Sequence, residues 1–277
     1  MMLRRSTMKQ NKKIGLLIGA TAVTATAWLA YCGYRWSWGP FTRLHGVKTS
    51  KKTGNAERYD LSHVQKLTGS PLEGKHLLFL GSSVTVGAAA QGVSFADYIG
   101  VRNGCTITKE AVSGTTLVDS DLDSYISRLK KIDTEMAADL FVCQLSTNDA
   151  TQKKPLGTLS DSYDADTFDT STVAGAIEYI IAYAEQTWSC PVVFYTNPQY
   201  DSPEYTAMVE LLHTIQEKWN IAVIDLWNDR DFNAITEEQR SLYMADAIHP
   251  TKAGYLQWWT PYMENVIWEV IGNEKDR

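Results

Sequence analysis

The stretch His76-Leu77-Leu78-Phe79-Leu80-Gly81-Ser82-Ser83 decides how the rest of this chain is organised. Its apolar run up to Leu80 is typical of a buried strand. After Gly81 the run gives way to small residues that carry hydroxyl groups. Because parallel sheets place their ligands outside the carboxyl ends of the strands, Ser82 and Ser83 are candidates for chemistry. Most serines after a strand only turn the chain or cap a helix, so this segment alone leaves both readings open.

Strand and helix patterns alternate along the chain after this stretch. Further strands are predicted at Thr106–Val112, Leu140–Leu145, Pro191–Thr196 and Ile221–Asp225. Helices are predicted at Phe95–Arg102, Asp121–Ile132, Val173–Trp188, Glu204–Trp219, near Glu237–Tyr243 and from Lys252 to Ile271. Five alternations indicate a parallel sheet covered by helices on both faces.

Two of these segments carry more specific expectations. A helix is expected over Asp121–Ile132, with Leu122, Ile126 and Leu129 on one face. The segment Thr151–Thr170 is polar, acidic and without periodicity, and it is long enough to form a rim or lid over a site.

Charge and cysteine content narrow the range of partners. Residues 1–56 carry ten Lys or Arg and no acidic residue, so the remaining chain holds 16 basic and all 32 acidic residues, a net charge of −16. A domain this acidic repels nucleic acid and anionic headgroups, which favours a neutral or cationic substrate. The four cysteines, Cys32, Cys105, Cys143 and Cys190, show no metal-ligand spacing, and no metal or cofactor is expected.

The N-terminal region predicts a membrane anchor. Residues Ile14–Gly33 are uncharged and mostly apolar, and as a helix they would span ~30 Å, the thickness of a bilayer core. We expect a basic head over residues 1–13 and an uncleaved transmembrane signal anchor over residues 14–34. A cleaved signal peptide and lipidation at Cys32 are the alternatives, but no clear Ala-x-Ala site follows and Tyr31 is too bulky for a lipoprotein box.

The orientation of this anchor is less clearly encoded than the anchor itself. Basic residues are equally numerous on its two sides, so the positive-inside rule does not discriminate between the two orientations. The basic head resembles export signals, and we therefore place the C-terminal domain outside the cell. Residues 35–74 are predicted to form a linker and lead-in segment, and residues 75–277 the folded domain.

Four polar segments that follow predicted strands have complementary chemistry. A serine such as Ser83 needs a base to take its proton. His249 has a suitable side chain, and Asp246, three residues earlier, can orient the ring. A developing oxyanion needs donors already aimed at it. The backbone N–H groups of Ser83 and Gly114 and the side-chain amide of Asn148 are candidates.

Together these segments resemble the GDSL or SGNH hydrolases. The family pattern is Gly-Asp-Ser, a glycine after the second strand, Gly-x-Asn-Asp after the third, and Asp-x-x-His near the C-terminus. The matching segments, in order over roughly residues 75–271, are Gly81-Ser82-Ser83, Ser113-Gly114, Ser146-Thr147-Asn148-Asp149 and Asp246-Ala247-Ile248-His249.

The resemblance implies a fold and a set of roles. The fold is a flavodoxin-like three-layer α/β/α sandwich with a five-stranded parallel sheet. Ser83 would be the nucleophile and first oxyanion donor, with Gly114 and Asn148 completing the oxyanion hole. His249 would be the base and Asp246 its orienting carboxylate.

The chain departs from the family pattern at two positions. Ser82 stands where the family has aspartate, and Ser146 where it has glycine. Neither position transfers the proton, so we expect tuned rather than lost activity, with Ser82 bonded to nearby backbone.

Competing motifs are weaker. No Gly-x-Ser-x-Gly elbow is present, which argues against an α/β-hydrolase. The penicillin-binding-like segments Ser127–Lys130 and Lys52–Gly54 occur in reversed order. Several other polar or aromatic residues fit structural roles better than a site: the aspartates Asp119, Asp121 and Asp123, the histidines His45, His63 and His213, and the pair Trp258 and Trp259, of which one should pack inward.

The sequence therefore predicts a membrane-anchored serine esterase. We expect it to remove acetyl or another short acyl group from an extracellular glycan or a small ester, through an acyl-enzyme on Ser83. Acyl transfer onto a glycan hydroxyl is the alternative reaction. A catalytically silent glycan-binding module is the alternative of another class, and the joint presence of Ser83, Asn148, Asp246 and His249 argues against it.

Overall fold

A computed structural model describes residues 51–274 of the chain. The predicted basic head, the predicted transmembrane anchor over residues 14–34 and the first part of the linker lie outside these residues. Within residues 51–274, no helix combines the length and apolar character that crossing a membrane requires.

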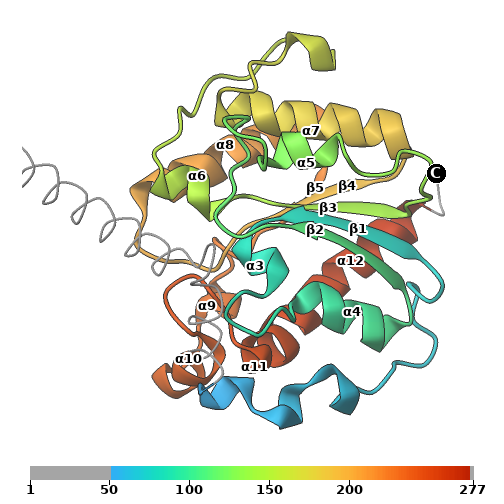
Figure 1. Cartoon of the computed structure of the whole chain (residues 1–277), viewed down its shortest axis with the longest axis vertical. Helices are drawn as coiled ribbons and strands as arrows, with labels where there is room; N and C mark the ends of the chain where they lie inside the picture. The colour runs from blue at the N-terminus through green and yellow to red at the C-terminus, as the bar shows by residue number, and fades with distance from the viewer. Residues whose placement is uncertain (1–50, 275–277) are drawn as a thin grey trace, which may run out of the picture. The chain divides into compact units, whose positions relative to one another are not determined.

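Five parallel strands form one sheet in the order β2-β1-β3-β4-β5 (Figure 1). The strands are β1 (His76–Gly81), β2 (Thr106–Ala111), β3 (Leu140–Gln144), β4 (Val192–Tyr195) and β5 (Ala222–Ile224). This is the flavodoxin-like strand order, in which the order reverses between β1 and β3. The predicted five-stranded parallel sheet is confirmed, and its reversal point places the ends of β1 and β3 side by side.

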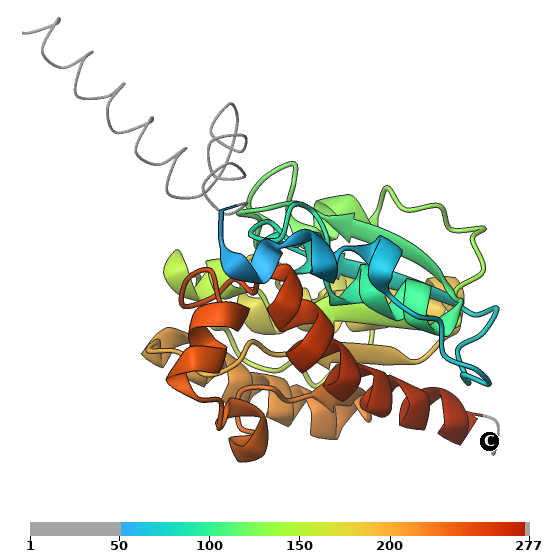
Figure 2. The ribbon, with the colours of Figure 1, turned by 90° about the horizontal axis from the view of Figure 1, so that it is seen from below.

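Helices cover both faces of the sheet. On one face lie α5 (Tyr125–Leu129), α7 (Val173–Trp188) and α8 (Pro203–Trp219). On the other lie α4 (Phe95–Asn103) and α12 (Thr260–Glu274), with α12 in the foreground of Figure 2. The side chains of β1 alternate between the two cores: Leu78 and Leu80 pack toward α7, and Leu77 and Phe79 toward α4. A strand buried on both faces reads as a continuous apolar run, which is why this stretch is so apolar.

Short helical turns connect these layers near the ends of the strands. They are α3 (Ser83–Val86), α6 (Thr147–Thr151), α9 (Arg230–Asn233), α10 (Glu237–Tyr243) and α11 (Lys252–Gly254), with 3₁₀ turns at Thr53–Asn55, Glu57–Tyr59, Leu61–His63 and Ala165–Thr167. A π-helical turn at Tyr255–Trp259 joins α11 to α12. Trp259 is fully buried and Trp258 stacks on Phe232 with ring centroids 4.6 Å apart, so one tryptophan of the pair packs inward as predicted.

The helix predicted over Asp121–Ile132 is shorter than expected. Helix α5 begins only after Ser124, whose side chain caps it by accepting the N–H of Ser127. Before it, the Asp121 carboxylate accepts the N–H of Asp123 and forms a turn that competes with the helix. The prediction that Leu122 shares a helix face with Ile126 and Leu129 is wrong, because Leu122 lies in this turn with its side chain 83% exposed.

The long loop between α6 and α7 lies against helices. The backbone N–H of Ser160 donates to the Glu178 carboxylate of α7 over 3.0 Å, and Lys218 of α8 donates to the Ser160 carbonyl over 2.7 Å. Tyr163 packs edge-on against Trp219. This part of the predicted rim or lid is therefore held along the outer helices α7 and α8.

Candidate active site

Ser83, His249 and Asp246 form one hydrogen-bonded row. Ser83 opens α3, directly after β1, and its Oγ lies 2.8 Å from Nε2 of His249. The other ring nitrogen of His249, Nδ1, lies 2.9 Å and 3.0 Å from the two carboxylate oxygens of Asp246. Because Asp246 accepts at Nδ1, the neutral ring carries its proton there, and Nε2 is left as an acceptor for the serine proton. The three groups thus have the order that nucleophilic catalysis requires.

The Asp246 carboxylate also accepts hydrogen bonds from the backbone of its own loop. One Asp246 oxygen also accepts the N–H groups of Ile248 (2.8 Å) and His249 (2.9 Å). Burial of the carboxyl tends to raise the pKa of Asp246, but the His249 hydrogen bond and charge, together with these N–H donors, outweigh it and lower the pKa well below its usual range. Asp246 is therefore ionised at neutral pH.

The turn that bears the nucleophile rests on a buried side chain from the neighbouring strand. The Oε1 atom of Gln144, at the end of β3, accepts the Ser82 N–H (2.9 Å), the Ser82 hydroxyl (3.3 Å) and the Thr85 hydroxyl (2.9 Å). Ser82 was expected to bond nearby backbone, and its hydroxyl donates to this side chain instead. Gly81 is required here, since a Cβ would stand 1.7 Å from Oγ1 of Thr85.

The candidate oxyanion donors come from the ends of three strands. Gly114 has φ +85°, in the left-handed region that favours glycine. The Asn148 side-chain amide donates to the Thr115 carbonyl over 2.9 Å, and one amide hydrogen remains for a ligand. Within residues 51–274, the backbone N–H groups of Ser83 and Gly114 make no hydrogen bond. Both are thus available as donors.

Two buried charged residues position this group of donors. The Arg128 guanidinium donates to the Gly81 carbonyl (2.8 Å) and to the Thr115 hydroxyl (3.1 Å), which joins the end of β1 to the turn at Gly114. Asp149 accepts the N–H groups of Leu117 and Val118 at 2.8 Å and 3.1 Å. Burial raises the pKa of Asp149 to about 6. The sequence analysis did not identify these roles of Arg128 and Gln144. For Gln144, a polar residue at the end of the apolar run of β3 was the one feature that could have indicated its role.

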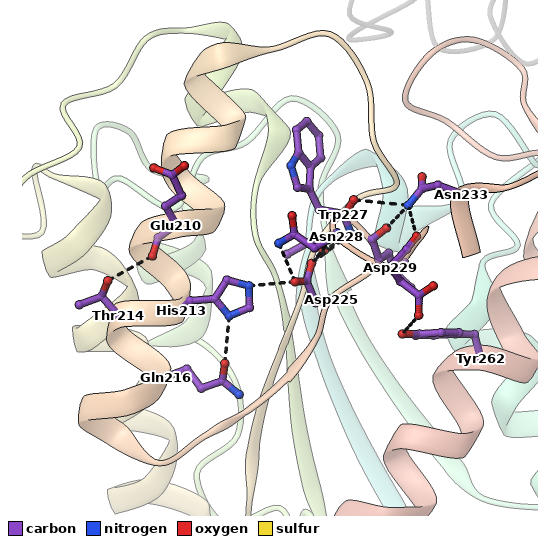
Figure 3. Close-up of polar contacts among 12 residues, drawn as sticks. Glu210, His213, Thr214, Gln216, Asp225, Trp227, Asn228, Asp229, Asn233 and Tyr262 are labelled. Atoms are coloured by element: carbon purple, nitrogen blue, oxygen red, sulfur yellow. Dashed lines mark hydrogen bonds and ion pairs between the residues drawn. The ribbon is translucent and has the colours of Figure 1, made fainter. Parts of the chain in front are cut away.

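A second histidine–carboxylate pair joins α8 to the end of β5 (Figure 3). His213 of α8 bonds Asp225, just after β5, through Nε2 at 2.8 Å, while its Nδ1 faces Oε1 of Gln216 at 3.1 Å. Asp225 also accepts the N–H groups of Trp227 and Asn228. With both ring nitrogens engaged by these neighbours, His213 has a structural role, as expected. In the part of the chain described, no three His, Cys, Asp or Glu side chains gather so as to hold a metal ion.

The comparison with protein-family models shows to which family the chain belongs. Residues 79–256 match the GDSL-like Lipase/Acylhydrolase family, which is more than half of the chain. The chain belongs to this family. It is a carboxylic ester hydrolase, as the sequence blocks predicted, and the family match includes all five residues predicted for the site. No curated protein matches the chain.

Several solved structures share the fold at low sequence identity. One is a structural-genomics protein from Lactobacillus plantarum, with TM-score 0.56 and 19% identity, covering 74% of this chain and 97% of that one. Another is a candidate lipase from Chitinophaga pinensis, with TM-score 0.52, 16% identity, and coverage of 72% and 98%. A third, a candidate lipolytic protein of the G-D-S-L family from Desulfitobacterium hafniense, has TM-score 0.52, 18% identity, and coverage of 70% and 99%. At these identities the likeness concerns the fold alone.

Proposed function

We propose that this chain is a serine esterase that hydrolyses acetyl or other short acyl esters of a glycan or small alcohol, with Ser83, His249 and Asp246 as the catalytic triad. The observation that carries the proposal is the continuous row from Ser83 Oγ to His249 Nε2 and from His249 Nδ1 to Asp246. A binding module would have no need of this arrangement at the carboxyl edge of the sheet.

The first half of the reaction transfers the acyl group to the enzyme. Ser83 Oγ attacks the ester carbonyl carbon while its proton passes to His249 Nε2. The carbonyl oxygen becomes negatively charged and is bound by the N–H groups of Ser83 and Gly114 and by the Asn148 amide. The intermediate collapses as the C–O bond to the alcohol breaks, and His249 returns the proton to the leaving oxygen.

The second half releases the acyl group. A water molecule gives a proton to His249 Nε2 as its oxygen attacks the acyl carbon on Ser83. The same three donors bind the second oxyanion, and the bond to Ser83 Oγ breaks as that oxygen takes the proton back. Asp246 stays ionised throughout and stabilises the imidazolium that forms twice per cycle.

The surface supports a short acyl group and a substrate that is not polyanionic. Binding a long acyl chain requires an apolar groove, since each buried CH₂ contributes only about 0.8 kcal/mol. Only five large apolar side chains are exposed in the described part of the chain, and they belong to separate segments: Val101, Val112, Leu122, Leu156 and Tyr163. The net charge of −16 after residue 56 disfavours anionic polymers.

A substrate screen tests this proposal. The full chain in detergent would be assayed against p-nitrophenyl esters of graded chain length and against acetylated glycans, with Ser83→Ala as the control. We expect turnover to be highest for acetyl and to fall as the chain lengthens. A preference for long chains would refute the short-acyl assignment, and acyl transfer to an added glycan instead of to water would make the chain a transferase.

We also propose that the catalytic domain lies outside the membrane, anchored by residues 14–34. The basic head and the apolar run Ile14–Gly33 support this topology. Protease added to intact cells should then remove the domain and leave a short anchored stub. A domain that is protected in intact cells and digested only after lysis would show the opposite topology.

A further inference from the structure

Residues 53–63, here called the N-terminal strap, are packed closely on the loops of the candidate site. They precede the part of the chain that matches the family, which begins at residue 79. At Gly54 a Cβ would stand 2.0 Å from the Leu242 carbonyl oxygen and 2.4 Å from Oγ1 of Thr251. The strap backbone therefore lies directly against the segments on both sides of the loop that carries His249.

Asn55, which is only 5% exposed, joins two loops through its side-chain amide. Its Nδ2 donates to the Ala89 carbonyl over 2.7 Å, in the loop that follows Ser83 and α3. Its Oδ1 accepts the backbone N–H of Lys252 over 2.8 Å, three residues after His249. We call residues 87–94, after α3, the nucleophile loop, and residues 244–252, which include His249, the base loop. The planar amide of Asn55 thus fixes the separation between these two loops.

Each end of this bridge is close to a reacting residue along the backbone. Next to Ala89, the N–H of Ala88 donates to the Ser83 carbonyl over 3.0 Å. On the other side, the His249 carbonyl accepts the N–H of Ala245 over 2.8 Å, and the N–H of Thr251, next to Lys252, donates to the Tyr243 carbonyl over 2.8 Å. Backbone hydrogen bonds therefore close the base loop next to Lys252.

A second connection runs parallel to the first. The Lys252 ammonium donates to Asp60 of the strap over 2.5 Å and to Gln91 of the nucleophile loop over 2.6 Å. Lys252 is 5% exposed, whereas Asp60 is half-buried and Gln91 is exposed, so the lysine holds the two partners from beneath the surface. The strap is thus bonded to both loops at two points.

We propose that Asn55 is a positioning residue that sets the Ser83–His249 distance, and that the N-terminal strap is thereby part of the catalytic apparatus of this chain. The inference rests on the proposed triad. An amide is needed because one atom must donate to a carbonyl while the other accepts an N–H, which no carboxylate or apolar side chain does. A misplacement of about 1 Å can cost ~10²-fold in rate, so we expect Asn55→Ala to lower the acylation rate constant by about 10-fold to 100-fold.

The test compares Asn55→Ala with a variant that loosens the strap elsewhere. Tyr98 of α4 donates its hydroxyl to the Tyr59 carbonyl over 2.6 Å, a strap contact that involves neither loop. Tyr98→Phe therefore serves as the matched control. The acylation rate constant and the substrate dissociation constant would be measured for full-length variants from the concentration dependence of the p-nitrophenol burst with p-nitrophenyl acetate, per folded molecule, beside thermal unfolding.

The expected results separate positioning from stability. Asn55→Ala should lose acylation rate with the substrate dissociation constant and the pH midpoint of kcat/KM as in the wild type, because the contact between His249 and Asp246 lies within one loop. Tyr98→Phe should lose stability but keep its acylation rate within about twofold. Equal acylation rates in the two variants would overturn the inference.

A second variant, Asn55→Asp, covers the case in which Asn55→Ala does not fold. The carboxylate keeps the acceptor for Lys252 but faces the Ala89 carbonyl without a hydrogen, whereas the protonated carboxyl can donate to it. The ratio of its acylation rate to that of the wild type should therefore rise as pH falls, and a ratio that is constant near one would refute the bridge. If the wild type does not hydrolyse p-nitrophenyl acetate, or if Ser83→Ala hydrolyses it equally well, the proposed triad fails rather than this inference.

Discussion

Replacing Asn148 with alanine tests the oxyanion hole that we propose. The Asn148 amide has two hydrogens, and one is already bound by the Thr115 carbonyl at 2.9 Å. The other is the donor assigned to the charged oxygen. Removing one such donor costs ~10²–10³ in kcat, or about 2.7–4 kcal/mol of transition-state stabilisation. KM should change little, because the oxygen carries its full charge only in the transition state.

The same change also removes the hydrogen bond to Thr115, and its structural cost must be separated from the catalytic one. One hydrogen bond contributes about 0.5–1.5 kcal/mol to stability. Ser146→Ala is the matched control, since the Ser146 hydroxyl donates to the same carbonyl at 3.3 Å and accepts the N–H of Asn148. Its loss should cost about 0.5–2 kcal/mol of stability as a helix cap while leaving the Asn148 amide in place.

Steady-state kinetics with p-nitrophenyl acetate and urea unfolding would be run on both variants. We expect kcat to fall by two to three orders of magnitude more in Asn148→Ala than in Ser146→Ala, with similar losses of stability. If the effect of Asn148→Ala falls on KM alone, or if the two variants lose kcat equally, the amide is not an oxyanion donor.

Three further outcomes follow from the geometry. Asp246→Asn should lower kcat by ~10⁴, because an amide can hold the His249 ring in the wrong tautomer; near-normal turnover would remove Asp246 from the mechanism. A fluorophosphonate should label Ser83, and labelling mapped by peptide mass should vanish in Ser83→Ala but persist in Ser82→Ala; an adduct on Ser82 would move the site by one residue. Since the folded pKa of Asp246 is lowered, its stabilising contribution is present above the usual carboxyl pKa near 3.9 and is lost as pH falls below it. The difference in free energy of unfolding between wild type and Asp246→Ala should therefore shrink from about pH 6 to about pH 2, whereas a constant difference in urea titrations would contradict the assigned direction.

The long elements could be predicted because their patterns report burial directly. Helix α7 has the predicted bounds, Val173–Trp188, since one face packs on the sheet over four turns. The short helices α3 and α6 have four and five residues and carry no periodicity. Tertiary contacts determine them, as when Gln144 orders the turn before α3.

The sequence predicted those residues of the candidate site that lie in short motifs or directly after apolar strands. Asp246 and His249 lie in one loop, and the serine and asparagine blocks follow apolar strands. Asn55 showed no signal, because an asparagine at the end of a 3₁₀ turn resembles an ordinary turn residue. Its role depends on Ala89 and Lys252, and only the folded chain brings these together.

The distance along the chain between the site's partners bears on how the protein folds. Ser83 meets His249 across 166 positions, and Asn55 meets Lys252 across 197. Contacts between residues so far apart in sequence form slowly, because closing the long loop between them costs conformational entropy before the contact contributes any stabilisation. In translation, the base loop leaves the ribosome only after all five strands have been made. Esterase activity should therefore return later in refolding than secondary structure does, which makes it a specific probe of the last folding step.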